Sequence, residues 1–570
     1  MRRVLMCAGC AVLLFGLAGA HVRSADLPSN SEIRRDGVAL VLEDYASLPL
    51  SSPTRAGLDS TTVDFQKLLG RATLLRDEPS GSPHAGTRLL IDDQSGTLYF
   101  LSRETREFTA YLRFVDIFPK FVSDIGNTTG INSFAFDPGY VRNGRFYTVH
   151  TELPSKMGSA VPTDTRVPAL DLKGYALTTA VALSVGSVHL ESVLIEWTDT
   201  NIRNAVFEGT VREILRVAYD RNHPMGDVVF NPLARPREND HGNLYIGVGD
   251  GASGETLGPA HGLPQQLGSM MGKILRITPD LSLHPEDPLG PNGRYRIPSS
   301  AADPNPFLWT PGARPEVFAY GLRNPHRLTW DVVSRVMLVD DIGLRSWEEV
   351  NVVIKGANYG YAEREGHEQL FVGATARGLT NSQMRPPVPF PAHDVLQVAG
   401  VSDHVTPLYP ALAYSHREGD AIGSGVVYRG KMLPQLRGKY IFTDITTARV
   451  FYADVKEMIA ARGARGRQAT IHELQIRHKM SATAQAVPRR LYDVIAEAYS
   501  RKGGRPPAGR VLPGGGAATG TVDPDGINYG GGRADTRILP DADGELYVLT
   551  KADGMIRKVT AVAARSVTGQ

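Results

Sequence analysis

Cysteine is nearly absent from this chain: its 570 residues contain only Cys7 and Cys10. Both lie near the N-terminus, where two arginines precede an almost wholly apolar run from Val4 to Leu17 and the small residues Ala18-Gly19-Ala20 follow. That pattern predicts a signal peptide over residues 1–20; the alternative is a retained N-terminal anchor. Once residues 1–20 are removed, no cysteine remains, which excludes disulfides, thiolate metal sites and covalently attached c-type haem.

Net charge and long apolar runs are also lacking. The 62 lysines and arginines nearly balance the 60 acidic residues, and removal of Arg2 and Arg3 with the leader makes the counts equal. A balanced chain offers no large electrostatic attraction to nucleic acid or anionic membranes. Because no later apolar run is long enough to span a bilayer, we expect a periplasmic or secreted protein without a membrane span. The oligomeric state is left open.

Turn residues are plentiful, with 59 glycines and 38 prolines, and one short pattern recurs. In each copy a turn residue precedes a run of alternating β-branched and aromatic residues, which is typical of a tight turn entering a half-buried strand. Repetition along the whole chain favours a repeat architecture over unrelated domains. The copies begin at Gly96, Gly144, Gly242, Gly438 and Gly544, with a weaker one at Ser334.

These strands predict an all-β, six-bladed β-propeller over residues 86–562, and two packed β-sandwich domains are the alternative. The uneven spacing of the copies indicates long insertions, which we expect near residues 152–220 and 477–533. The second insertion contains a predicted helix over Pro488–Ser500. Residues 21–85 are polar and predict an irregular N-terminal extension, and residues 563–570 form a tail.

Between about residues 130 and 453 a set of short motifs follows in order. It comprises Ile131-Asn-Ser-Phe-Ala-Phe-Asp-Pro138, Leu244-Tyr-Ile-Gly-Val-Gly-Asp250-Gly251, Gly272-Lys-Ile-Leu-Arg-Ile277, Ala319-Tyr-Gly-Leu-Arg-Asn-Pro-His326, Asp341-Ile-Gly343, Trp347-Glu-Glu-Val-Asn351, Gly356-Ala-Asn-Tyr-Gly360 and Gly425-Val-Val-Tyr-Arg-Gly430. The set resembles the glucose/sorbosone dehydrogenase family, especially members related to the propeller of the hedgehog-interacting protein. The resemblance implies pyrroloquinoline quinone (PQQ) at the mouth of a central channel, often with Ca²⁺.

The resemblance places the general base of such an enzyme at His223 and its supporting carboxylate at Asp250. An imidazole suits proton abstraction because its ordinary pKa lies near neutrality, and a carboxylate orients and stabilises it. The alternative is an ordinary turn histidine. Arg323, Asn324 and Arg533 match the residues that would hold the cofactor, and a guanidinium can bind a carboxylate or stack on the quinone plane. Alternatively, Arg323 closes a blade and pairs internally.

Two cation positions also follow from the resemblance. The backbone carbonyls of Gly343 and Leu344 match ligands of a cofactor-side Ca²⁺, and Glu349 with Tyr359 matches a structural one. Oxygen ligands from side chains and backbone suit a hard cation. The alternative is a solvated acidic turn.

The resemblance therefore implies an exported dehydrogenase that oxidises the anomeric hydroxyl of an aldose to a lactone. PQQ accepts the hydride, and a separate molecule takes the electrons, since the mature chain carries no haem cysteine. The main alternative is a non-catalytic propeller that binds a glycan or protein, because Thr129, Met225 and Asp227 depart from the family pattern and one of a pair of arginines near Arg533 is missing. Lactone hydrolysis is a weaker alternative.

Overall fold

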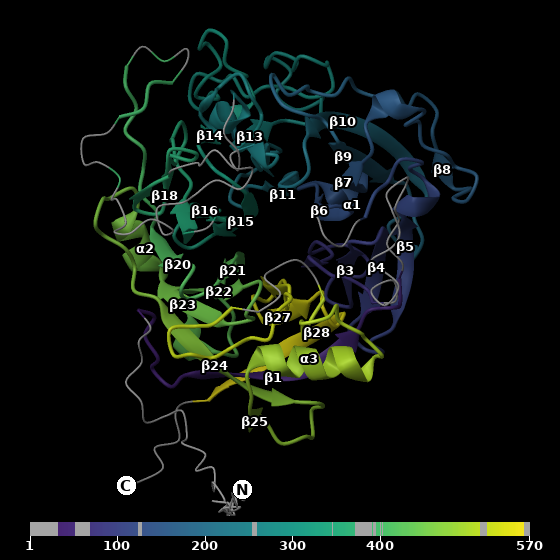
Figure 1. Cartoon of the computed structure of the whole chain (residues 1–570). Helices are drawn as coiled ribbons and strands as arrows, with labels where there is room; N and C mark the ends of the chain where they lie inside the picture. Colours follow the sequence, from purple (N-terminus) through teal and green to yellow (C-terminus); the bar gives the residue numbers. More distant parts are fainter. Residues whose placement is uncertain are drawn as a thin grey trace, which may run out of the picture.

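The strands form antiparallel sheets arranged in a ring, an all-β, propeller-like fold (Figure 1). The structure is a computed structural model, and it describes residues 32–51, 69–123, 128–253, 259–344, 346–370, 390, 395–398, 401, 403–513 and 521–563. The predicted signal peptide and residues 564–570 of the tail lie outside these ranges. Within them, no helix is long and apolar enough to cross a membrane.

Four sheets around the ring each contain a four-stranded antiparallel meander. The first comprises β2 (Leu75–Asp77), β3 (Arg88–Asp93), β4 (Thr97–Ser102) and β5 (Phe108–Arg113). The second comprises β6 (Ile131–Phe136), β7 (Arg145–Glu152), β9 (Leu190–Asp199) and β10 (Gly209–Tyr219), with β8 (Leu170–Asp171) at its edge. The third is β11 (Met225–Phe230), β12 (Leu244–Val248), β13 (Lys273–Ile277) and β14 (Val317–Tyr320). The fourth is β15 (Pro325–Asp331), β16 (Val336–Asp341), β17 (Trp347–Val352) and β20 (Leu412–Ser415).

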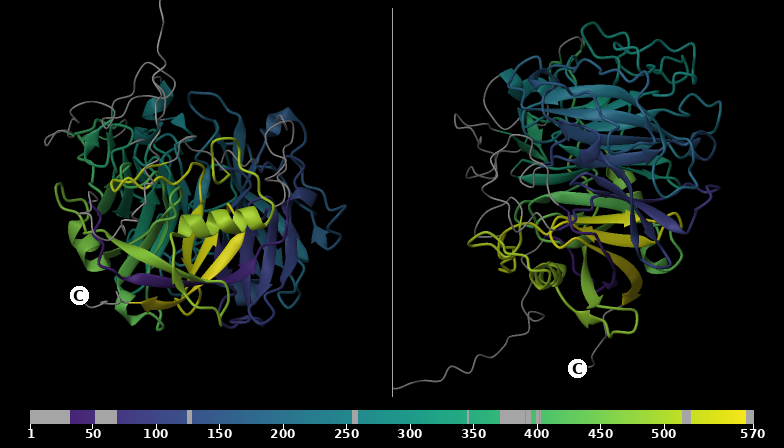
Figure 2. Two further views of the ribbon diagram at one scale, coloured as in Figure 1. Left: turned by 60° about the horizontal axis from the view of Figure 1, so that its bottom comes forward. Right: turned by 90° about the vertical axis from the view of Figure 1, so that its right-hand side faces the viewer.

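A nine-stranded sheet completes the ring and joins the two ends of the chain. One half is β21 (Ile422–Val427), β22 (Lys439–Asp444), β23 (Val450–Asp454) and β24 (His472–Lys479); the other is β26 (Thr536–Pro540), β27 (Leu546–Thr550), β28 (Met555–Ala563) and β1 (Ala39–Ser47). Strand β1 pairs antiparallel with β28 and parallel with β24. In Figure 2 the purple β1 therefore runs between green and yellow strands.

The remaining elements are short and lie between or beside the sheets. Strands β18 (Arg364–Glu365) and β19 (Glu368–Gln369) form a small hairpin, and β25 (Val487–Pro488) pairs with β24. The α-helices are α1 (Tyr140–Asn143), α2 (Val455–Ala461) and α3 (Leu491–Arg501), and the 3₁₀ turns are η2 (Phe114–Asp116), η3 (Ser155–Met157), η5 (Pro259–Gln265) and η7 (Pro434–Leu436). Helix α3 lies where the sequence predicts a helix.

All six predicted strand segments are strands, namely β4, β7, β12, β16, β22 and β27. The turn before β7 shows why glycine recurs there. Gly144 has a φ of 63°, a left-handed conformation that glycine adopts without steric cost. A Cβ at Gly144 would lie 1.9 Å from the carbonyl oxygen of Asp199, so the close approach of two strands also requires its absence.

Two predicted boundaries are wrong. Residues 21–85 contain β1 and β2, so this segment contributes strands to two sheets rather than only an irregular extension. Strand β1 was missed although the turn glycine Gly37 precedes it, because its buried pattern depends on partners at both of its edges. Residues 152–220 contain β9 and β10, which are integral strands of the second sheet; the connection between β7 and β9 is the part that departs from a simple meander.

The second sheet buries a cluster of charged residues. Arg216 has no exposed surface, and its guanidinium donates to Glu152 at 2.7 Å, to Glu191 at 3.0 Å and to Glu213 at 2.8 Å. His150 also contacts Glu152, with 3.0 Å between ring nitrogen and carboxylate oxygen. A buried carboxylate needs a cation or hydrogen-bond donors. Arg216 supplies both to acidic residues of three strands, β7, β9 and β10.

Candidate functional site

A cavity of about 280 Å³ lies where residues from all five large sheets converge. Because the first strands of the meanders contact one another around the ring, side chains at their ends meet there although they lie far apart in sequence. The lining includes Thr73 and Gln94 near the ends of β2 and β3, Asn132 of β6, Gly226 of β11, His326 of β15, Ala421 beside β21 and Arg537 of β26.

His223 and Asp250 form a hydrogen-bonded pair at the wall of this cavity. The distance from His223 Nδ1 to Asp250 Oδ1 is 2.6 Å, and Asp250 has no exposed surface. His223 itself lines the cavity. An Nδ1–H donated to the carboxylate leaves Nε2 as the acceptor nitrogen, so the geometry is that of an oriented general base.

The backbone around the pair fits this role closely. His223 has a φ of 57°, which is uncommon for a residue with a side chain. A Cβ on Gly249 would lie 2.4 Å from His223 Cβ, so the glycine before Asp250 permits the approach of the two segments. The amide of Asp250 donates to the carbonyl of Arg323 at 2.7 Å, which ties the pair to the next predicted site residue.

Arg323 and Asn324 line the same cavity and share one carboxylate anchor. Their backbone amides donate to Asp341 at 3.1 Å and 2.6 Å, respectively. The Arg323 Nη1 donates to the carbonyl oxygens of Ile342 at 3.0 Å and Gly343 at 2.5 Å. Asp341 therefore fixes the backbone of the pair, while the guanidinium is directed along the Ile342–Gly343 segment.

The cavity brings together six of the nine predicted site residues, namely His223, Arg323, Asn324, Gly343, Leu344 and Arg533. Asp250 lies behind the lining and is hydrogen-bonded to His223. Arg533 lies 3.8 Å from Asp420, measured from Nη2 to Oδ2. Glu349 and Tyr359 lie instead on a separate cavity of about 10 Å³.

Several cations in the cavity were missed by the sequence analysis. They are Arg71, Arg327, Arg537 and Lys551, whereas Asp420 and Asp535 are the acidic residues of the lining. Burial lowers the pKa of Lys551 to about 7, against the attraction of Asp535. Burial likewise lowers the pKa of Arg537 to about 10. A cavity with this excess of cations favours an anionic ligand with several charges.

His326 supplies a neutral polar group to the same lining. It is 6% exposed, and neither ring nitrogen has a hydrogen-bond partner among the described residues. Burial, together with Arg327, Arg537 and Lys551, lowers its pKa well below the ordinary value for histidine. A neutral imidazole has one donor and one acceptor nitrogen, so His326 offers both to a bound molecule.

The residues that depart from the family pattern have structural roles. Met225 is fully buried and packs in a hydrophobic core. Asp227 accepts from the Ser133 hydroxyl at 2.6 Å and from the Leu328 amide at 3.2 Å, and so links β6, β11 and β15. Neither belongs to the described lining of the central cavity. Thr129 is also fully buried.

Comparison with known proteins gives related sequences over much of the chain. HIPL1 protein of Arabidopsis thaliana is 24% identical over 442 residues, which cover 73% of this chain and 56% of that protein. Hedgehog-interacting protein of Homo sapiens is 27% identical over 296 residues, which cover 50% of this chain and 35% of that protein. The chain thus spans about half the length, or less, of these curated relatives.

Solved structures give a more distant likeness. The soluble aldose sugar dehydrogenase (Asd) of Escherichia coli, in its apo-form, is 16% identical with a TM-score of 0.49, and the alignment covers 87% of this chain and 97% of that one. A family model described as Glucose / Sorbosone dehydrogenase matches residues 214–403, a segment that contains eight of the nine predicted site residues. The predicted resemblance is therefore confirmed, and the central part of this chain carries the signature of the glucose/sorbosone dehydrogenase family.

Proposed function

We propose that this chain is an exported quinoprotein oxidoreductase that oxidises the anomeric hydroxyl of an aldose to a lactone and passes the electrons to a separate acceptor. The observation that carries the proposal is the His223–Asp250 pair at the wall of a cation-rich cavity. Export rests on the predicted signal peptide over residues 1–20. Six blades are part of the proposal, since the nine-stranded sheet divides into two four-stranded meanders beside the four separate sheets.

The lining fits PQQ, a flat molecule with three carboxylates. Arg323, Asn324 and Arg533 would hold it as the resemblance implies, and Arg537 and Lys551 add cations that offset the missing arginine. Charge-assisted hydrogen bonds to carboxylates are about twice as strong as neutral ones. The two free nitrogens of His326 are a further sign that the cavity is built to contact a polar molecule.

The protein's own part in the reaction is proton abstraction. His223 Nε2 takes the proton of the anomeric hydroxyl while the C–H hydrogen leaves as hydride. Asp250 keeps the acceptor nitrogen directed into the cavity and stabilises the imidazolium that forms. PQQ, when bound, supplies the hydride acceptor. Each sugar loses one proton and one hydride, so two electrons pass through the cofactor to the external acceptor.

The arrangement does not fit a calcium ion beside the cofactor as the side chains stand. The carbonyl oxygen of Gly343, one of the predicted ligands, accepts a hydrogen bond from Arg323 Nη1 at 2.5 Å. The proposed proton transfer therefore contains no step through calcium.

The proposal is tested by titrating the full mature chain with PQQ and then adding a panel of aldoses with an artificial electron-accepting dye. We expect saturable binding of one quinone per chain and dye reduction that depends on both quinone and sugar. Folded protein that binds no quinone would refute the enzyme and leave the alternative, a propeller that binds a glycan or protein. The name Hedgehog-interacting protein, borne by one relative, keeps that alternative in view.

We expect quinone affinity to fall as the pH rises through about 7, the pKa of Lys551. An anionic ligand favours protonated Lys551, so the pKa of Lys551 is higher in the complex than in the free protein. The ammonium therefore contributes fully to quinone affinity below the pKa of the free protein, and this contribution is lost as the pH rises through the pKa of the complex. Loss of one charge-assisted contact costs about 1.5–3 kcal/mol, which is roughly a tenfold or greater change in Kd. Equilibrium titrations across this pH range measure the change.

The matched control for this pH dependence is Lys551→Met, which removes the titrating ammonium. It should bind the quinone weakly at low pH and show a flatter profile than the unchanged protein. Equal slopes for the two proteins would assign the pH dependence to other groups and contradict the role of Lys551.

A further inference from the structure

Three buried carboxylates meet beside the central cavity, in the place where the resemblance implies a structural metal ion. Asp341, Glu349 and Glu365 all line the small cavity of about 10 Å³, and none is more than 6% exposed. Burial, reinforced by the nearby Glu349, raises the pKa of Asp341 well above its ordinary value. Carboxylates that stay ionised in such a cluster need a cation or hydrogen-bond donors close by.

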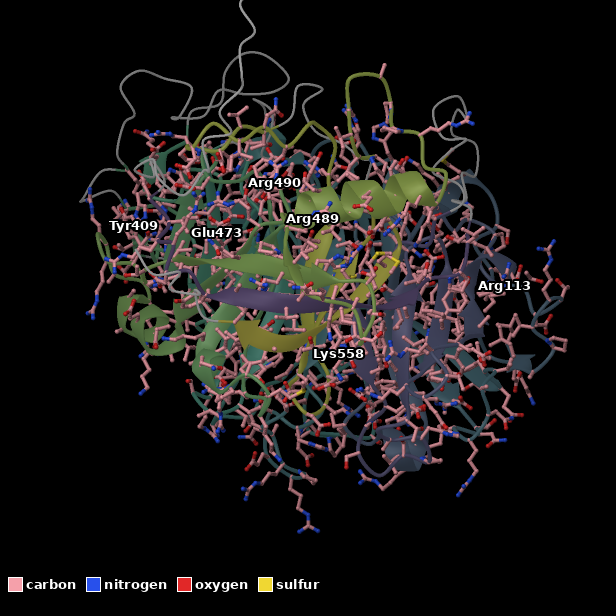
Figure 3. All side chains as sticks on the ribbon, turned by 90° about the horizontal axis from the view of Figure 1, so that it is seen from below. Arg113, Tyr409, Glu473, Arg489, Arg490 and Lys558 are labelled. Atoms are coloured by element: carbon pink, nitrogen blue, oxygen red, sulfur yellow. The ribbon has the colours of Figure 1, made fainter. Side chains whose placement is uncertain are left out.

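Arg364 lines the same small cavity, and its Nε and Nη1 are buried without a hydrogen-bond partner among the described residues. It is 1% exposed, and its Nη2 donates to the carbonyl oxygen of Tyr359 at 2.8 Å and to that of Leu408 at 2.5 Å. The Tyr359 carbonyl is one of the two predicted metal ligands. The guanidinium carbon of Arg364 also lies 4.2 Å from the centre of the Tyr409 ring, a distance that favours a cation–π contact. Tyr409 is labelled in Figure 3.

The second predicted ligand is engaged as well. Glu349 accepts hydrogen bonds from the Gly366 amide at 2.5 Å and from Asn351 Nδ2 at 3.1 Å. The charge of Arg364 opposes the rise that burial causes in the pKa of Glu349. The small cavity has a volume of about 10 Å³. This is close to the minimum of about 10–15 Å³ that one water molecule requires.

We propose that Arg364 is a built-in cation that occupies the place of the metal ion expected at Glu349 and Tyr359. A guanidinium carries a permanent charge and five donors in one plane, so it can neutralise a carboxylate cluster and satisfy carbonyl oxygens together. Asp341 belongs to this cluster and anchors the amides of Arg323 and Asn324. The wall of the central cavity is therefore assembled without calcium, whether or not the protein is an oxidoreductase.

The first test measures calcium in the quinone-free full chain by mass spectrometry, together with the Tm in chelator and in excess Ca²⁺. We expect substoichiometric calcium and the same Tm in both solutions. Stoichiometric calcium that a chelator removes with a fall in Tm, and that Glu349→Gln also loses, would overturn the proposal. This measurement needs no variant of Arg364 that folds.

The second test uses Arg364→Ala, which leaves the carboxylates without their cation. We expect a lower Tm in chelator, a rise of a few degrees on addition of Ca²⁺, and one bound calcium per chain. The matched control is Arg364→Lys, which keeps a positive charge and should bind no calcium. Folded Arg364→Ala that gains neither calcium nor calcium-dependent stability would overturn the assignment of a cation site here.

Discussion

Replacement of His223 by alanine is expected to lower kcat/KM for aldose oxidation by about a hundredfold to ten-thousandfold, the usual contribution of a positioned general base. The loss should fall mainly on kcat, because the cations proposed to hold the quinone are separate residues of the cavity lining. Steady-state kinetics with saturating quinone measure both constants. Quinone titration of the variant should give a Kd close to that of the unchanged protein.

Asp250→Asn probes the same function through the partner of His223. The amide keeps the size of the carboxylate but removes the charge that stabilises the imidazolium, so kcat should fall while the Tm changes little. His404→Ala is the control, since His404 is exposed and lies outside the described lining. A His223 variant with undiminished kcat/KM would show that another group accepts the proton.

Replacement of Arg216 by methionine is expected to destabilise the fold by about 3–5 kcal/mol, the usual cost of removing one partner from a buried ion pair. The variant leaves Glu152, Glu191 and Glu213 buried without their common cation. Methionine has a similar volume and no charge, so cavity formation contributes little. Denaturant titration, or the Tm where unfolding is irreversible, measures the effect.

The surface pair of Arg113 and Asp116 provides the matched comparison. The distance from Arg113 Nε to Asp116 Oδ2 is 2.7 Å, and the Arg113 side chain is 54% exposed. Figure 3 labels Arg113 at the periphery of the molecule. Exposed pairs contribute about 0–1 kcal/mol, so Arg113→Met should leave the Tm nearly unchanged. If Arg216→Met costs no more than Arg113→Met, the buried carboxylates do not depend on Arg216.

The strands that the sequence predicted share one property: local turn chemistry specifies them. Gly144 illustrates it, because the left-handed turn and the close approach to Asp199 are properties of the immediate surroundings. The resemblance to a known family implied which residues would face a ligand, and the structure brings His223 and Arg323 among them to one cavity. Such local signals survive in a single sequence because they need no knowledge of distant partners.

Residues whose role depends on distant partners escaped prediction. Arg71 and Lys551 lie at opposite ends of the chain, and only the ring brings both to one cavity. Strand β1 likewise becomes buried only between β24 and β28. No motif indicated Arg364. It donates to Leu408 and shares a cavity with the carboxylates of Asp341 and Glu349, which lie on β16 and β17.

Strand β1 also dictates the order in which the molecule can be completed. It is among the first strands synthesised, yet its antiparallel partner β28 is the last. The edge of β1 that pairs with β28 therefore stays open until β28 is made, across a loop of about 500 residues whose closure costs entropy that grows only slowly with length. Until β28 is available, this unpaired strand edge can pair with other chains. A chain shortened before Met555 lacks the antiparallel partner of β1 and leaves that edge of the strand unpaired.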